Sequence, residues 1–282
     1  MLSAASRGAG LGVAACVLAL AAADQASAAL TCNFNAGSGL LTVRSSGFEE
    51  VVALRREGGE GDEIEISNDQ MGGPGDLACA GGTPTVNNTD SIVLDDLPGA
   101  VNPAVYFDYS KGQMSPGIEN EAPDASEIEI AVEWEDGFFG LGGGNLGDTY
   151  LFGASIFGPA VKTTRDVDGD AFLGSTMSVL VRGERGRDTL SGRGDSTGYI
   201  GPLEIPMTIE GGPGKDKLTG GAKRDILYGE GGKDKLSGGA AKDIFEVEGG
   251  KKDKVTCGTG NDKVFADAAD KIAADCEKVF VS

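Results

Sequence analysis

The sequence predicts an all-β fold that ends in a coil of short, stacked parallel strands. One observation is a nine-residue unit that recurs between residues 211 and 265. Another is strand-like alternation upstream, without long segments of the 3.6-residue apolar period typical of amphipathic helices. Because one unit is too short to bury its own apolar residue, neighbouring units must stack to form a core.

Each unit contains glycines, then an aspartate, then an apolar residue two positions later. The aspartates are Asp216, Asp225, Asp234, Asp243, Asp253 and Asp262. Their apolar partners are Leu218, Leu227, Leu236, Phe245, Val255 and Val264. An earlier unit adds Asp188 and Leu190, and a late half-unit adds Asp270 and Ile272. We expect each D-x-apolar step to form a short strand with its apolar side chain pointing inward.

The glycines before each aspartate predict sharp turns, because a residue without Cβ tolerates left-handed backbone and close approach. Such turns present bare carbonyl oxygens, and the aspartate adds a carboxylate. Calcium takes six to eight hard oxygen ligands in flexible geometry. The repeat therefore predicts calcium sites at the turns.

The units GGPGKDKLT, GGAKRDILY, GEGGKDKLS and GGAAKDIFE resemble the RTX (haemolysin-type) nonapeptide G-G-x-G-x-D-x-U-x, where U is a large apolar residue. The resemblance implies a right-handed parallel β-roll, with two units per turn and calcium between turns. It also implies that each aspartate is shared with the unit two further on, as in Asp216 with Asp234, Asp225 with Asp243, and Asp243 with Asp262. The implied metal-site residues are Gly183, Gly186, Asp188, Gly211, Gly214, Asp216, Asp225, Gly229, Gly232, Asp234, Asp243, Asp253, Gly258, Gly260 and Asp262.

Some units depart from the family pattern. Their fourth position, normally glycine, is Lys223, Ala241 or Lys251. A Cβ there costs conformational energy, and lysines flank several of the aspartates. We therefore expect some sites to bind weakly, and the alternative is a roll that stacks without binding much calcium.

The N-terminus resembles a secretory signal peptide. It has a positive start at Arg7, an apolar core from Ala9 to Ala23, and a cleavage pattern ending at Ala28. Residues 1–28 would be removed on export. The alternative is a lipoprotein signal in which Cys16 is lipidated.

Four cysteines remain after removal of that signal, which in an exported chain indicates two disulfides. Of the three pairings we favour Cys32–Cys79 and Cys257–Cys276. Each bond would then fasten one end of the coil, where fraying is easiest.

The formal net charge is −20, and it is distributed unevenly. Residues 29–182 hold 25 acidic and 7 basic residues, whereas residues 183–282 hold 18 and 16. The acidic first half argues against nucleic acid and anionic membranes as its partners. No segment after the signal is apolar enough for a transmembrane helix.

Residues 29–182 show strand-like alternation and worn fragments of the repeat, such as Asp148-Thr149-Tyr150 behind a glycine-rich turn. We expect a degenerate β-coil, or alternatively a separate β-sandwich-like region. The Pro- and Gly-rich stretch Asn102–Asp124 indicates a surface loop or linker. Asp166–Asp170 has three carboxylates, but the glycine and glutamate of an EF-hand loop are missing. We expect a solvated acidic loop there, and the alternative is a cation site of another kind.

The sequence argues against an enzyme. It contains no histidine, which excludes a Ser-His-Asp triad and an H-E-x-x-H zinc helix. Ser196 lies in a G-x-S-x-G string, but that motif needs a strand before it and a helix after it. Here the string follows a repeat and precedes Gly201-Pro202.

The predicted organisation is a signal peptide at 1–28, an acidic β-rich region at 29–182 and a calcium-binding roll with a C-terminal cap at 183–282. The predicted function is that of a secreted or cell-surface protein whose folding is coupled to binding of several calcium ions. Alternatives are an adhesion or matrix protein that uses the roll as a spacer and binds cell-surface components, and a hydrolase with a β-roll tail.

Overall fold

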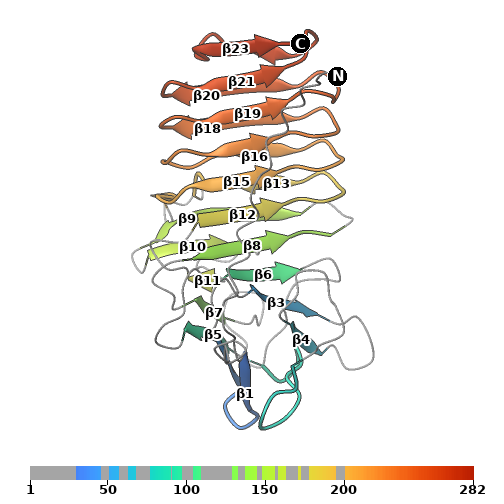
Figure 1. The fold of residues 1–282 in the computed structure, drawn as a ribbon, viewed down its shortest axis with the longest axis vertical. Coiled ribbons are helices and arrows are strands. Elements are labelled where there is room, and N and C mark those ends of the chain that lie inside the picture. The colour runs from blue at the N-terminus through green and yellow to red at the C-terminus, as the bar shows by residue number, and fades with distance from the viewer. Residues whose placement is uncertain are drawn as a thin grey trace, which may run out of the picture.

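A computed structural model describes residues 30–45, 51–56, 63–67, 77–89, 91–96, 104–108, 129–132, 137–144, 148–155, 158–162, 171–172, 178–194 and 201–282. These residues form an elongated stack of short strands and contain no helix (Figure 1). Two sheets run along the stack, and the chain crosses from one to the other in successive turns. The prediction of an all-β fold with a parallel β-roll is confirmed.

The first sheet, in spatial order, has these strands within the described ranges: β1 (Thr31–Asn35), β2 (Leu40–Ser45), β5 (Ser91–Asp96), β7 (Glu129–Val132), β11 (Ala171–Phe172), β10 (Gly158–Lys162), β9 (Thr149–Ser155), β13 (Thr189–Ser191), β16 (Lys217–Thr219), β18 (Lys235–Ala240), β20 (Lys254–Thr259) and β22 (Lys271–Ile272), with β14 (Gly201–Pro202) beside β9.

The second sheet, again within the described ranges and in spatial order, consists of β23 (Lys278–Val281), β21 (Lys263–Ala266), β19 (Ile244–Val247), β17 (Ile226–Tyr228), β15 (Met207–Glu210), β12 (Ser178–Arg182), β8 (Phe138–Gly142), β6 (Ala104–Asp108), β3 (Val51–Arg56) and β4 (Ile64–Ser67).

From β15 to the C-terminus strand pairing is parallel and in the register of the repeat, whereas the short β14 before it pairs antiparallel with β9. In the first sheet Leu218 pairs with Leu236, and in the second sheet Leu227 pairs with Phe245. These four side chains are buried in a single core between the two sheets. The nine-residue period therefore places one apolar residue per half-turn on the inside.

The first half continues the same two sheets. Strand β8 pairs in parallel with both β6 and β12, and β9 pairs in parallel with β13. The regular stack is interrupted by antiparallel pairs, such as β9 with β10 and β3 with β4. Larger side chains fill the core here, including Phe107, Phe139 and Phe152. The described strands of this half therefore belong to the same two sheets as the strands of the roll.

The expectation of a surface loop at Asn102–Asp124 is wrong for Ala104–Asp108, which form strand β6 between β3 and β8 with Val105 and Phe107 in the core. The rest of that stretch lies outside the described residues.

Both expected disulfides are present, one near each end of the stack. Cys32 on β1 bonds to Cys79, and Cys257 on β20 bonds to Cys276 before β23. Within the described ranges, no helix is long and apolar enough to cross a membrane. The predicted signal peptide, Cys16, Asp166–Asp170 and Ser196 lie outside the described residues.

Candidate metal centre

The parallel register brings the aspartates into two columns, one along each edge of the roll. The column on the edge that leads into the first sheet, the first-edge column, contains Asp148, Asp188, Asp216, Asp234, Asp253 and Asp270. The column on the edge that leads into the second sheet, the second-edge column, contains Asp225, Asp243 and Asp262. Each aspartate immediately precedes a strand, so the strand fixes its height in the column.

Each aspartate is tied to the next turn by a hydrogen bond from its backbone. The N–H of Asp216 donates to Oδ1 of Asp234 at 2.8 Å, and the N–H of Asp234 donates to Oδ1 of Asp253 at 2.7 Å. On the second edge, the N–H of Asp225 donates to Oδ1 of Asp243 at 2.9 Å. One carboxylate oxygen per aspartate is thereby used to hold adjacent turns together.

The second carboxylate oxygen has no such partner. Six aspartates are at most 2% exposed and hold an Oδ2 atom that is buried without a hydrogen bond. They are Asp188, Asp216, Asp234, Asp243, Asp253 and Asp262. Burial of an ionised carboxylate without compensation is costly, so each of these oxygens calls for a proton or a cation.

Backbone carbonyls converge on the same spaces. A Cβ built on Gly183 would lie 2.6 Å from the carbonyl oxygen of Gly211 and 2.7 Å from Oδ2 of Asp188. One turn further on, a Cβ on Gly211 would lie 3.2 Å from the carbonyl oxygen of Gly229 and 3.1 Å from Oδ2 of Asp216. The first glycine of each unit therefore leaves room beside an unpartnered carboxylate oxygen and a carbonyl of the adjacent turn.

The electrostatics of the columns favour a proton or a cation as well. The pKa of Asp234, Asp225 and Asp243 is raised from the ordinary value of 3.8 to about 7, mainly by burial and also by neighbouring aspartates, while hydrogen bonds from backbone N–H groups oppose the rise. Burial likewise raises the pKa of Asp188 and Asp253 to about 6. At neutral pH the ionised carboxylates of the columns therefore lack a compensating positive charge.

Asp225 differs from the other column members. Its Oδ2 accepts a hydrogen bond from the N–H of Gly221 at 2.6 Å, and its Oδ1 accepts one from the N–H of Met207 at 2.8 Å. Its unit carries Lys223 where the family pattern has glycine. Both oxygens of Asp225 are thus already engaged, which fits the expectation that some units bind a cation weakly.

In most turns the residue four positions before the aspartate has a left-handed backbone conformation. This position has a positive φ in Gly212, Gly239, Gly249 and Gly258, and also in Glu184 and Glu230. Ala241 has a φ of 76°, whereas Lys223 and Lys251 are absent from the left-handed set. Of the three departures at the fourth position, only Ala241 is therefore strained.

The donor set of the columns suits calcium. Among the described residues no three His, Cys, Asp or Glu side chains gather as a metal cluster, so a cation would take most of its ligands from the backbone. Carboxylate and carbonyl oxygens are hard ligands, which favour calcium over zinc or copper. The unpartnered Oδ2 atoms and the carbonyls beside the glycines fit this ion.

The structure brings together the site residues expected from the sequence. Gly186, Gly214 and Gly232 form successive parallel bridges between turns on the first edge. On the second edge, Gly258 pairs with Gly239, and Gly260 packs against the carbonyl of Ala241. The three expected aspartate pairs are those joined by backbone-to-carboxylate hydrogen bonds.

Two residues that extend the columns, Glu277 and Asp148, were not among the site residues expected from the sequence. Glu277 accepts a hydrogen bond from the N–H of Asp262 at 2.9 Å, and so takes the place of a further aspartate. The N–H of Asp148 donates a hydrogen bond to Oδ1 of Asp188 at 2.7 Å, which extends the first-edge column into the acidic half. The D-x-apolar step at Asp148 was the signal for the second case. For Glu277 the repeat gave none, because the glycines are lost there.

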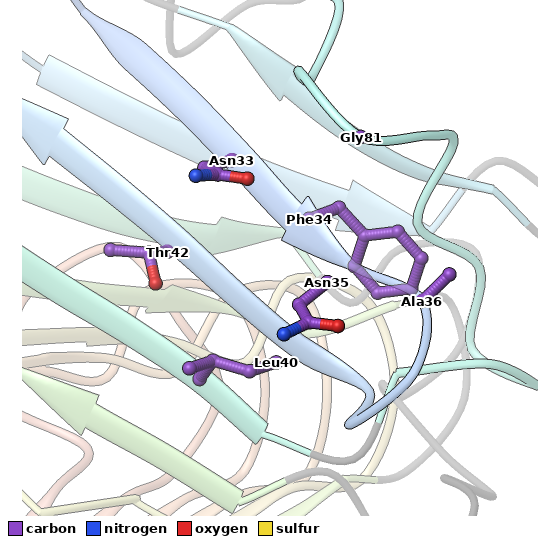
Figure 2. A pocket seen from close by; sticks show the side chains of 7 residues that line it. All are labelled: Asn33, Phe34, Asn35, Ala36, Leu40, Thr42 and Gly81. Atoms are coloured by element: carbon purple, nitrogen blue, oxygen red, sulfur yellow. The ribbon is translucent and has the colours of Figure 1, made fainter.

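A cavity of about 450 Å³ lies at the opposite end of the stack, beside the β1–β2 hairpin. It is lined by Asn33, Phe34, Asn35, Ala36, Leu40, Thr42 and Gly81 (Figure 2). Its lining has amide and hydroxyl groups but no acid, base or thiol. It therefore provides no acid–base pair for catalysis.

Comparison with known families agrees with this geometry. Residues 210–245 match the RTX calcium-binding nonapeptide repeat in four copies. The chain thus carries RTX calcium-binding repeats, as the sequence motif indicated. Searches among curated proteins and among solved structures give no match.

Proposed function

We propose that this protein binds several calcium ions along the two edges of its β-roll, and that calcium binding completes the folding of the roll. The observation that carries the proposal is the row of six buried Oδ2 atoms without hydrogen-bond partners. Calcium between turns would compensate these oxygens and draw the adjacent carbonyls together. The match to RTX repeats supports the same ion.

The energetics favour coupling between binding and folding. Ordering a glycine-rich turn costs more conformational entropy than ordering other residues. An extracellular calcium site with a dissociation constant of about 0.1 mM contributes about 1.4 kcal/mol at about 1 mM free calcium. A few such sites supply an amount comparable with the net stability of a typical domain.

The proposed role is structural or binding rather than catalytic, in an exported protein. The two disulfides are compatible with an oxidising compartment. A folding switch driven by millimolar calcium would keep the roll loose in the cytosol and form it outside the cell. The second half of the chain would then be the calcium-dependent element, built on the coil of residues 29–182.

The test is a calcium titration of the purified protein, followed by far-UV circular dichroism with magnesium and EGTA as controls. We expect a cooperative gain of β-signal between sub-millimolar and millimolar calcium, weakened in Asp234→Ala. A spectrum already rich in β-structure in EGTA and unchanged by calcium would refute the proposal.

A further inference from the structure

A row of lysines crosses the outer face of the first sheet in strict register. Lys217 pairs with Lys235, Lys235 with Lys254, and Lys254 with Lys271. The four side chains are exposed and alternate with buried residues of the core. These four residues, the lysine row, stand one strand apart on β16, β18, β20 and β22, at the end of the stack nearest the C-terminus (Figure 1).

The lysine row is unfavourable for the isolated fold. Strands are spaced by about 4.8 Å, and like charges directly opposite one another on a sheet destabilise it. Among the described residues, no carboxylate forms a salt bridge with any of the four lysines. Three more exposed lysines, Lys215, Lys233 and Lys252, lie two residues before members of the row. The charge of this face is therefore not balanced within the roll.

Burial of the column aspartates leaves an excess of positive charge on the surface of the roll. Of the 18 acidic residues between 183 and 282, seven are the buried aspartates of the two columns. The other 11 stand against 16 basic residues in the same segment. Once calcium compensates the columns, the surface of the roll is cationic, although the whole chain has a formal charge of −20.

A column of hydroxyl groups runs beside the lysine row. Thr219, Ser237 and Thr256 pair in register and lie on the same side of their strands as the lysines. Thr219 is buried, whereas Ser237 and Thr256 are partly exposed. Strands β16, β18, β20 and β22 contain no aromatic residue and no arginine. Aromatic side chains and arginine are the usual anchors of protein interfaces, and aromatic platforms are needed to stack unpaired bases. This face lacks both.

We propose that the lysine row and its hydroxyl column bind a linear acidic polysaccharide that lies along the stack. Regularly spaced ammonium groups match the regularly spaced carboxylate or sulfate groups of such a polymer. The partly exposed hydroxyls of Ser237 and Thr256 can exchange hydrogen bonds with sugar hydroxyls. The occupant is identified by charge complementarity over a straight, regular row that offers no anchor for a folded protein.

The test uses the full protein in constant millimolar calcium, with chondroitin sulfate and hyaluronan as probes, dextran as the neutral control, and polyglutamate and poly(dT) as polyanions that are not polysaccharides. The row variant changes Lys217, Lys235, Lys254 and Lys271 to Gln. The matched variant changes Arg224, Lys242, Lys263 and Lys278 to Gln, which removes the same charge from a basic cavity on the second sheet. Circular dichroism and the calcium midpoint establish that both variants fold.

We expect the unmodified protein to bind both acidic probes but not dextran, with an affinity that falls as salt rises. The row variant should lose at least about tenfold in affinity and show a shallower salt dependence, because fewer counterions are released. The matched variant should bind nearly as well as the unmodified protein. If the row variant does not fold, the pair Lys235→Gln and Lys254→Gln provides the same comparison with a smaller loss.

Three outcomes would overturn the inference. Equal losses in the two variants would mean attraction by net charge alone. Equal affinity for polyglutamate or poly(dT) would mean that the sugar is not recognised. Salt-sensitive self-association that depends on the row, without saccharide binding, would identify the acidic half of a second copy as the occupant.

Discussion

The backbone N–H of Asp216 donates to Oδ1 of Asp234 at 2.8 Å, while Oδ2 of Asp234 is buried without a partner. The side chain of Asp234 thus joins two turns through one oxygen, while the other oxygen faces the space beside Gly229 of its own unit. The same division recurs along both edges. Because the two oxygens belong to one carboxylate, the stacking of turns and the binding of a cation depend on the same side chain.

Replacement of Asp234 by Asn should have opposite effects with and without calcium. Asn keeps an acceptor for the N–H of Asp216 but removes the charge. In EGTA at pH 7.5 the variant should be more stable than the unmodified protein, because an uncompensated buried carboxylate is gone. In about 1 mM calcium it should lose at least about 1.4 kcal/mol, the contribution of one site of about 0.1 mM affinity.

Asp225→Asn is the matched control for this experiment, because both carboxylate oxygens of Asp225 already accept backbone hydrogen bonds. Its effect on the calcium midpoint, measured by chemical denaturation at several calcium concentrations, should be smaller than that of Asp234→Asn. Equal shifts in the midpoint would show that the unpartnered Oδ2 does not mark the cation position.

The calcium-free roll should become less stable as pH rises from about 4 to 7. Asp225, Asp234 and Asp243 have folded-state pKa values of about 7, against 3.8 for an ordinary aspartate. Within this window the folded state binds more protons than the unfolded state, so the free energy of unfolding falls as pH rises. Above the folded-state pKa the loss is complete.

Saturating calcium should reverse this dependence, because protons and calcium compete for the same carboxylates. Thermal melts between pH 4.5 and 8, in EGTA and in excess calcium, provide the measurement. Parallel pH profiles under the two conditions would argue against the proposed sites.

Much of this arrangement could be read from the repeat, because a fixed period determines both the register and the burial pattern. Leu218 and Leu236 had to stack once the units were aligned, and so did Asp216 and Asp234. The capping role of Glu277 could not be foreseen, since it depends on where the chain turns after the last glycine. The path of residues 29–182 was also only partly predictable, because irregular spacing permits several strand orders.

Substitution by alanine should destabilise the protein at glycines that lie against oxygen atoms of the adjacent turn, and should have little effect at glycines that do not. A Cβ on Gly214 would collide with the carbonyl of Gly186 and with Oδ1 of Asp216, whereas a Cβ on Gly231 would meet only Pro213, at 3.9 Å. Gly214→Ala should therefore cost about 1–3 kcal/mol, as expected for overpacking, and should raise the calcium midpoint. Gly231→Ala should change both quantities little. Similar denaturation curves for the two variants would contradict this view of the turns.

Ala241 offers a test in the opposite direction. Its φ of 76° is one that residues with a Cβ rarely adopt, and the family pattern has glycine at this position. Ala241→Gly relieves a strain of about 1–2 kcal/mol, partly offset by the greater entropy of glycine in the unfolded chain. The variant should gain about 0.5–1 kcal/mol at fixed calcium in urea denaturation. Ala222→Gly is a suitable control, since Ala222 is outside the left-handed set and should only lose stability. A loss in Ala241→Gly equal to that of the control would mean that this turn stores no strain.

The disulfide between Cys257 and Cys276 should stabilise the last turns of the roll against local unfolding. It closes a separation of 19 residues, for which loop entropy predicts roughly 3 kcal/mol. Beyond it, β23 is an exposed edge strand whose Phe280 stacks on Phe265 at 5.0 Å. The double variant Cys257→Ala and Cys276→Ala should therefore fray from this end, with faster amide exchange in β22 and β23 and a higher calcium requirement. Strands β16 and β17, several turns away, should exchange at their original rate because each turn contacts only its neighbours. Uniform acceleration along the whole roll would instead show that the stack unfolds as one unit, and would assign the disulfide a global rather than a local role.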